Sequence, residues 1–207
     1  MSVVRGLPVK HVSLALMVWL WLGASLPAEA AGTYFTTPQV LKEFFPQSQR
    51  VSFRKVKLGP AELAAVQGRL GYKPAKPEYV IFVATTGEHV DGYAIIDEEL
   101  GQHEQITFAV KLSPAGAVER HEVMVYREKY GEEITDARFR RQFQGKTAKD
   151  PVRAGVDIDV VTGASISSRS MAVGVRRALI LLDELILKPG ALSGAHSAAP
   201  GATSSKG

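Results

Sequence analysis

A group of hydroxyl side chains around one glycine is the part of the sequence best suited to hold a ligand. The segment reads Thr162-Gly163-Ala164-Ser165-Ile166-Ser167-Ser168 and stands directly before a long run with an apolar stripe. Glycine permits a positive φ and lets a phosphate approach the backbone. A helix N-terminus adds unbonded N–H groups and a partial positive charge. We therefore expect a strand end, a glycine turn and a helix beginning near Ser167, arranged to bind a phosphorylated ligand.

The same residues are also typical of a plain helix cap with a glycine turn that binds nothing. A serine hydroxyl is a poor nucleophile without a base, and no histidine lies near Ser167 in the sequence. This pattern favours an acceptor that another enzyme modifies over a catalytic serine acting alone.

Composition excludes several other kinds of site. The chain of 207 residues has no cysteine, so disulfides, thiol nucleophiles and thiolate metal sites are excluded. The net charge is only +4, and the basic residues are scattered among acidic ones without forming a stripe. This distribution argues against nucleic-acid binding. The histidines lack metal-ligand spacing, so no metal site is predicted.

The first 30 residues have the pattern of a cleavable secretory signal. Arg5 and Lys10 precede an uncharged run over residues 12–26, and small residues surround Glu29. The alternative is a membrane anchor, but the run is shorter than the roughly 20 residues that cross a bilayer. A periplasmic location is therefore predicted.

The elements needed to position the hydroxyl segment follow from hydrophobic periodicity. Residues 37–45 and 60–70 have helical patterns on either side of a strand at 51–58. Residues 79–85 with 92–96, and 106–112 with 118–126, read as two antiparallel hairpins. A short helix is expected after Ile134, and a last strand over 157–161. The fold class is α+β: an antiparallel hairpin meander packed with several helices.

The long C-terminal helix after the hydroxyl segment has the strongest pattern. Apolar residues recur at three- and four-residue spacing through residue 187, and a solvent-exposed face is predicted for Arg169, Arg176 and Arg177. The predicted organisation is a signal at 1–30, a helix-strand-helix extension at 31–77, a main domain at 78–188 and a disordered tail at 189–207.

The motif resembles the covalent flavinylation motif of the FMN-binding domain family. An acidic residue, Asp159, precedes Thr162-Gly163-Ala164-Ser165, and a hydroxyl follows one residue later at Ser167. The likeness extends over residues 79–187. The family includes extracytoplasmic subunits of the sodium-pumping NADH:quinone reductase and of Rnf-type complexes, so a domain of this kind is expected here.

The resemblance implies how the flavin is attached. In the family, a separate magnesium-dependent flavin transferase moves FMN from FAD onto the motif hydroxyl and releases AMP. Ser167 takes the place of that hydroxyl, where many members have threonine, and Ser168 is its neighbour. Asp159 is assigned to transferase recognition or to fixing the turn.

Further site residues follow from the resemblance. Glu128, Tyr130 and Gly131 occupy a loop that the family places near the flavin ring. Tyr126 and Tyr130 either stack on the ring or belong to the core or its rim. The predicted FMN-binding set is completed by Thr162, Gly163, Ala164, Ser165, Ile166 and Ser168 around Ser167.

Three functions remain open from the sequence. The first is an electron carrier that exchanges electrons with membrane redox proteins through FMN tethered at Ser167. The second is a flavin-dependent reductase of a small acceptor. The third is a non-redox binding or sensing module. Because no substrate-specific catalytic pair is present, a carrier is favoured over an enzyme.

Overall fold

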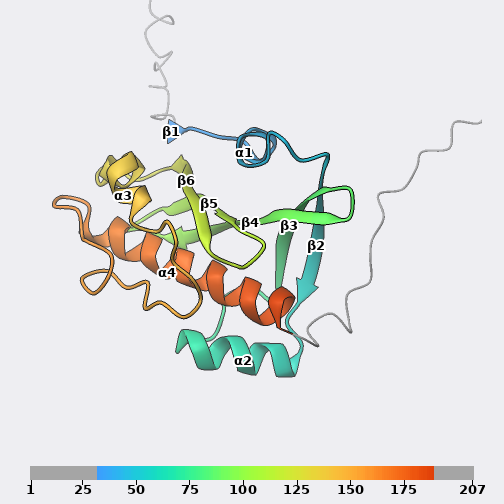
Figure 1. Ribbon diagram of the computed structural model, residues 1–207. Helices are drawn as coiled ribbons and strands as arrows, with labels where there is room; N and C mark the ends of the chain where they lie inside the picture. Colours follow the sequence, from blue (N-terminus) through green and yellow to red (C-terminus); the bar gives the residue numbers. More distant parts are fainter. Residues whose placement is uncertain (1–31, 189–207) are drawn as a thin grey trace, which may run out of the picture. The chain divides into compact units, whose positions relative to one another are not determined.

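A six-stranded antiparallel sheet forms the centre of the structure, a computed structural model that describes residues 32–188. Its order is β1-β6-β5-β4-β3-β2 (Figure 1). The predicted α+β class with a hairpin meander is thereby confirmed, whereas the predicted signal and tail lie outside the described residues. The strands are β1 (Gly32–Thr33), β2 (Arg50–Lys57), β3 (Glu78–Thr86), β4 (His89–Leu100), β5 (Gln105–Leu112) and β6 (Val118–Tyr126).

Each strand forms because apolar side chains alternate toward a buried face. In β3, Tyr79, Ile81 and Val83 point into one core, and Ile95 of β4 stands opposite Ile81. β2 pairs along its whole length with β3, so the region N-terminal to residue 78 contributes an edge strand to the same sheet.

The helix α4 (Ser165–Leu182) covers one face of the sheet and continues as a π-helical turn at Asp183–Leu187. Its apolar stripe, including Met171, Val175 and Leu179, is fully buried in the larger core. At Gly174, an added Cβ would lie 2.5 Å from the Phe108 ring. Close contact between helix and sheet therefore requires glycine at this position.

Two further helices complete the layers. The helix α1 (Thr37–Phe44) packs on the opposite face of the sheet, where Val40 and Phe44 form a second core with small residues of β3, β4 and β5. The helix α2 (Pro60–Leu70) lies beside α4 (Figure 1) and ends at Gly71, whose φ is +82°.

The connection from β6 to α4 differs from the prediction in one respect. No strand forms over residues 157–161; the segment is a loop whose only ladder contact is an isolated bridge between Ala154 and Ile158. A short 3₁₀ turn (Glu132–Thr135) and the expected short helix, α3 (Ala137–Arg141), precede this loop, and Phe139 and Phe143 are buried.

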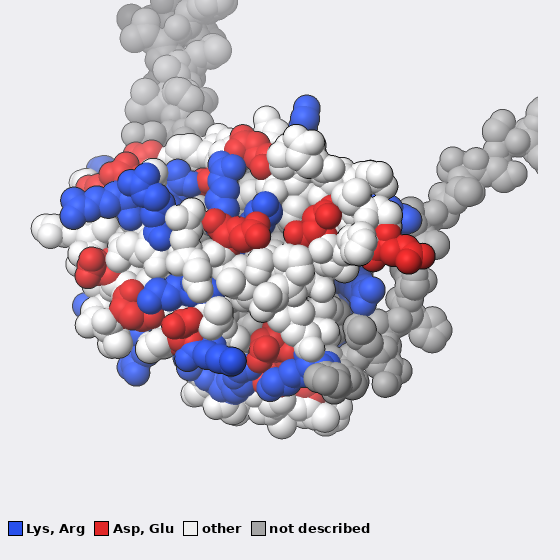
Figure 2. Space-filling model, viewed as in Figure 1, with Lys and Arg blue, Asp and Glu red and all other residues white. Residues whose placement is uncertain are grey.

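Charged side chains of both signs are interspersed over the face in Figure 2. This distribution agrees with the interpretation that the basic residues form no broad stripe on that face. Within residues 32–188, no helix has the length and apolarity needed to cross a bilayer.

Candidate functional site

The hydroxyl segment forms a glycine turn followed directly by the first turn of α4. Gly163 has φ +86°, as expected for a tight turn, and Ala164 is the N-cap residue. The helix begins at Ser165, two residues earlier than predicted. The Ser168 N–H donates to the Ala164 carbonyl at 2.8 Å, and no side chain caps the helix end. The N–H groups of the first helical residues therefore remain available to an anion.

Ser167 projects from this first turn toward the end of β6. Its side chain is 4% exposed, and its Oγ lies 2.9 Å from the Tyr126 hydroxyl. The Tyr126 hydroxyl donates its only proton to the Tyr130 carbonyl at 2.5 Å, so Ser167 must donate to Tyr126. Ser167 is buried because the end of β6 and the loop after it cover the helix start.

Gly131 is the closest part of that loop. It has φ +90°, and an added Cβ would lie 2.7 Å from the Tyr126 hydroxyl and 2.8 Å from the Ser167 Oγ. Only a residue without a side chain fits there, so the structure brings Gly131 and Ser167 together as the predicted site requires.

Ser168 has a structural role that Ser167 lacks. It is fully buried, and its Oγ accepts the N–H of Val161 at 3.2 Å. This hydrogen bond ties the loop before the glycine turn to the helix. Ser167, by contrast, uses its proton and keeps its oxygen lone pairs unbonded by any described residue.

The side chains of Glu128 and Tyr130 make no hydrogen bond to Ser167 in the described structure, although the Tyr130 carbonyl accepts the Tyr126 hydroxyl that contacts Ser167. The Glu128 carboxylate accepts the N–H groups of His103 and Glu104 at 2.6 and 3.0 Å. Burial alone would raise the Glu128 pKa, but these backbone hydrogen bonds lower it by more, so the pKa is below its usual value. Tyr130 is 72% exposed beneath the Lys129 ammonium. Glu128 therefore supports the β4–β5 turn, and Tyr130 offers an exposed ring near Gly131.

The backbone of Asp159, and not its side chain, is fixed in the structure. Its N–H donates to the Gln142 amide oxygen at 2.6 Å, and its carboxylate is exposed. Gln142 was not predicted, and only its position after the α3 pattern could have indicated a contact. The remaining predicted residues lie around the turn: Thr162, Gly163 and Ile166 are exposed, Ser165 is half-buried and Ala164 is buried.

The electrostatic surroundings of Ser167 are acidic on the loop side. Glu132 and Glu133 are exposed, and a Cβ at Gly163 would lie 3.6 Å from a Glu133 carboxylate oxygen. Burial raises the Tyr126 pKa, and Glu128, Glu133 and Glu132 contribute to that shift. Tyr126 therefore stays protonated and cannot serve as a base for Ser167.

The three arginines of α4 have different environments. Arg169 is exposed, as predicted, whereas Arg177 is only 7% exposed and binds Asp97 and Glu99 at 2.8 and 2.5 Å. Arg176 donates to the carbonyls of Arg69 and Leu70 at the end of α2. The predicted solvent-exposed face was wrong for Arg177, because the helix turns this residue toward β4.

Comparisons with known proteins give one family match, over the segment that contains this site. Residues 101–180 match the model of the FMN-binding domain, and this span includes every residue of the predicted site. Solved structures that match include the NqrC of Shewanella oneidensis, at 16% identity and a TM-score of 0.47, over 65% of this chain and 80% of that chain. No curated protein matches the sequence. Residues 101–180 are therefore similar to the FMN-binding domain.

Proposed function

We propose that this protein is an extracytoplasmic electron-transfer flavoprotein that carries FMN in phosphoester linkage to Ser167. The observation that carries the proposal is the position of the Ser167 hydroxyl. It lies in the uncapped first turn of α4 beside Gly131, within the segment that matches the FMN-binding domain. FMN supplies reversible oxidation and reduction when bound.

The residues present fit a flavin phosphate. Free N–H groups of the first turn of α4 donate hydrogen bonds, and Gly163 and Gly131 remove side chains from the approach. Thr162 and Ser165 add hydroxyls beside the turn. A phosphate can therefore be accommodated without rearranging the helix.

The acidic neighbours favour a covalent link over reversible binding. The Glu133 carboxylate lies beside Gly163, and the nearby Glu132 carboxylate accepts a hydrogen bond from the Tyr34 hydroxyl; among residues 32–188, no lysine or arginine pairs with either. Like charges at short range weaken the retention of a free phosphate. A covalent bond holds the phosphate regardless of this repulsion and prevents loss of the cofactor by dilution.

The chemistry of attachment must come from outside the chain. Ser167 donates to a protonated tyrosine, so no base in contact with it can remove its proton. A magnesium-dependent transferase would form the bond between the Ser167 oxygen and the FMN phosphorus of FAD. The pyrophosphate bond breaks, AMP leaves, and the serine proton passes to a base of the transferase. Because Ser167 is buried, its side chain must turn away from Tyr126 for this step.

A carrier is favoured over a reductase of a small acceptor. Two cavities in the described part of the chain are lined by other residues, and neither includes Ser167, Gly131 or Tyr130. A flavin on Ser167 would therefore lie near the surface around the exposed Tyr130, where its ring can reach a protein partner. Membrane redox proteins are the proposed partners, in the periplasm.

The test is the intact mass of the mature protein after co-expression with an active flavin transferase, followed by peptide mapping. We expect the mass of FMN minus water on the peptide containing Ser167, and a flavin that is reduced and reoxidised reversibly. Ser167→Ala should remain unmodified, and Ser168→Ala should still be modified.

Three outcomes would contradict the proposal. An unmodified protein, with the transferase active on a control substrate, would leave reversible flavin binding or a non-redox module. Attachment at Ser168 would assign the wrong hydroxyl. Finding the folded protein only in the cytoplasmic fraction would contradict the proposed periplasmic location.

A further inference from the structure

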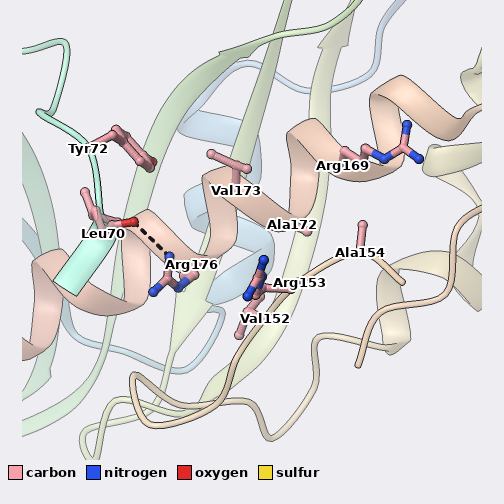
Figure 3. A pocket seen from close by; sticks show the side chains of 9 residues that line it. All are labelled: Leu70, Tyr72, Val152, Arg153, Ala154, Arg169, Ala172, Val173 and Arg176. Carbon is pink, nitrogen blue, oxygen red and sulfur yellow. Dashed lines mark hydrogen bonds between the residues drawn. The ribbon is translucent and has the colours of Figure 1, made fainter. Parts of the chain in front are cut away.

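A cavity of about 320 Å³ lies beside α4, on a different side of the helix from Ser167. Figure 3 shows it between α4, the end of α2 at Leu70 and the loop containing Val152 and Arg153. Ala172 and Val173 of α4 form part of its wall together with Leu70 and Val152. A volume of this size with an apolar lining is in the range that binds small organic molecules.

Two arginines at this cavity have no partner. Among residues 32–188, no hydrogen bond or ion pair involves the guanidinium of Arg153 or that of Arg169, and both side chains are exposed. Arg176 also lines the cavity, but it donates to the carbonyls of Arg69 and Leu70 at 2.7 and 3.0 Å. Arg153 and Arg169 therefore leave positive charge available to an anion beside an apolar wall.

The backbone that carries Arg153 is held in an unusual conformation. Val152 has φ +43°, the only positive φ of a non-glycine residue in the described chain, and its side chain is 1% exposed. A β-branched residue adopts this conformation only when its surroundings require it. Such backbone often occurs at ligand sites, and here it places Arg153 beside the cavity.

Asp157 imposes this conformation. Its carboxylate accepts the N–H groups of Val152 and Arg153 at 3.2 and 2.7 Å, and Lys146 binds it at 2.8 Å. Burial alone would raise the Asp157 pKa, but the hydrogen bonds from Val152 and Arg153 and the charge of Lys146 lower it by more. The carboxylate therefore remains charged near neutral pH. The loop is consequently fixed before any ligand arrives, which reduces the entropy lost on binding.

The cavity is separate from the flavin attachment site. Arg169, Ala172 and Val173 share one face of α4, because successive residues are rotated by about 100°. Ser167 lies on the opposite side of α4, rotated by roughly 180° around the helix axis, and contacts Tyr126 at the end of β6. A flavin on Ser167 therefore leaves this cavity open.

We propose that this cavity binds a small organic anion with a flat apolar body. The body packs against the exposed side chains of Tyr72 and Val173, and a carboxylate or similar group lies beside Arg153, with Arg169 adding positive charge at the same cavity. The site is independent of the flavin, so its ligand can be present whether or not Ser167 is modified.

The test uses 2-naphthoate and its neutral analogue 2-naphthalenemethanol as probes, with protein lacking flavin. Binding is followed by calorimetry and by amide chemical shifts. We expect saturable binding of naphthoate, with shifts at Val152, Ala154 and Val173, and about tenfold weaker binding of the neutral probe, since one charge-assisted contact is worth about that factor. Arg153→Gln and Arg169→Gln should each weaken naphthoate binding severalfold and leave the neutral probe unaffected.

Two control variants separate this site from general charge and from the flavin site. Arg138→Gln removes an exposed arginine of α3 that does not line the cavity, and Ser167→Ala removes the flavin acceptor. Both should bind naphthoate as the parent protein does. The proposal is overturned by no saturable binding at millimolar probe, by equal affinity for both probes, or by loss of binding in Ser167→Ala.

Discussion

Ser167 and Arg177 are two buried polar residues of the same helix, and their surroundings differ in one instructive way. Arg177 donates to Asp97, to Glu99 and to the Glu98 carbonyl, and Lys76 also binds Asp97. Ser167 makes one hydrogen bond, to Tyr126, and retains unused lone pairs next to free helix N–H groups. A fully satisfied polar group anchors the fold, whereas one with unused capacity can accept a ligand.

Burial does not distinguish these two residues, because both are less than one-tenth exposed. The distinction lies in what surrounds them. Asp97 and Glu99 of β4 form ion pairs with Arg177. Gly131 and Gly163, which have positive φ, have no side chains that would occupy the space near Ser167. The middle of α4 is therefore assigned to stability and its first turn to function, and each assignment can be tested by mutation.

Gly131→Ala should have the largest effect, because it fills the space beside Ser167. The added Cβ would lie 2.8 Å from the Ser167 Oγ and 2.7 Å from the Tyr126 hydroxyl. We expect covalent flavin to be lost, measured as the modified fraction of folded protein after co-expression with the transferase.

Gly145→Ala is the matched control for this variant. Gly145 has a similar φ of +77°, but an added Cβ there has no atom within 4 Å. It should lose about 1–2 kcal/mol of stability through backbone strain and remain fully modified. Complete modification of Gly131→Ala would show that close approach at this loop is not needed.

Arg177→Met tests the anchoring region and should give the next largest effect. It leaves Asp97, which is 4% exposed, with Lys76 as its remaining partner. We expect unfolding in urea to show a loss of about 3 kcal/mol, because an uncompensated buried charge is costly. The flavin should still attach to Ser167 at low temperature.

Arg169→Met is the comparison for that loss. Its side chain is exposed and has no ion-pair partner in residues 32–188, so the free energy of unfolding should change by less than about 0.5 kcal/mol. A loss for Arg177→Met no larger than this would show that the buried charge cluster contributes little to stability.

The sequence was sufficient to predict most helices and strands, but not to predict which polar residues of α4 are buried and paired. Alternation in β3 to β6 and the stripe of α4 are local patterns, so their positions could be predicted within a few residues. Arg176 and Arg177 are identical in type, and only the rotation of about 100° between neighbours sends one to the end of α2 and the other to β4. That outcome depends on tertiary packing.

The candidate site was predictable to a similar extent. The motif correctly indicated a turn at Gly163 and placed the helix start within two residues, because these features depend on adjacent residues. The cover over Ser167 comes from Tyr126 and Gly131, which are far away in sequence, so its burial could not be derived locally. The expected strand at residues 157–161 does not form, because the Asp159 N–H donates to Gln142 and the Asp157 carboxylate accepts the N–H groups of Val152 and Arg153, which holds the segment as a loop.

His121 is a third buried polar side chain, and it extends the comparison because no residue among 32–188 makes a hydrogen bond to it. Both ring nitrogens lack a hydrogen bond, and the ring lies between Phe108 and Phe143. Burial, with a smaller contribution from Arg140, lowers the His121 pKa to about 3. The folded state therefore keeps the imidazole neutral down to that pH, while the unfolded state protonates near pH 6.5.

Stability should consequently fall as the pH falls from about 6.5 toward 3, because only the unfolded state binds this proton. Between pH 7.5 and pH 5 the contribution of His121 is about 2 kcal/mol. In His121→Leu, the difference in unfolding free energy between these two pH values should shrink by that amount. An unchanged difference would mean that the folded protein admits the proton.

Tyr126→Phe should have the smallest effect and tests whether the partner of Ser167 takes part in its modification. The change removes the acceptor for the Ser167 proton and the donor to the Tyr130 carbonyl, which should cost about 1 kcal/mol in stability. Because Tyr126 remains protonated, it cannot act as the base, and mass spectrometry should show Ser167 still fully modified after prolonged co-expression. An unmodified but folded Tyr126→Phe protein would place this hydroxyl in the transfer reaction itself and would extend the functional region from the first turn of α4 to the end of β6.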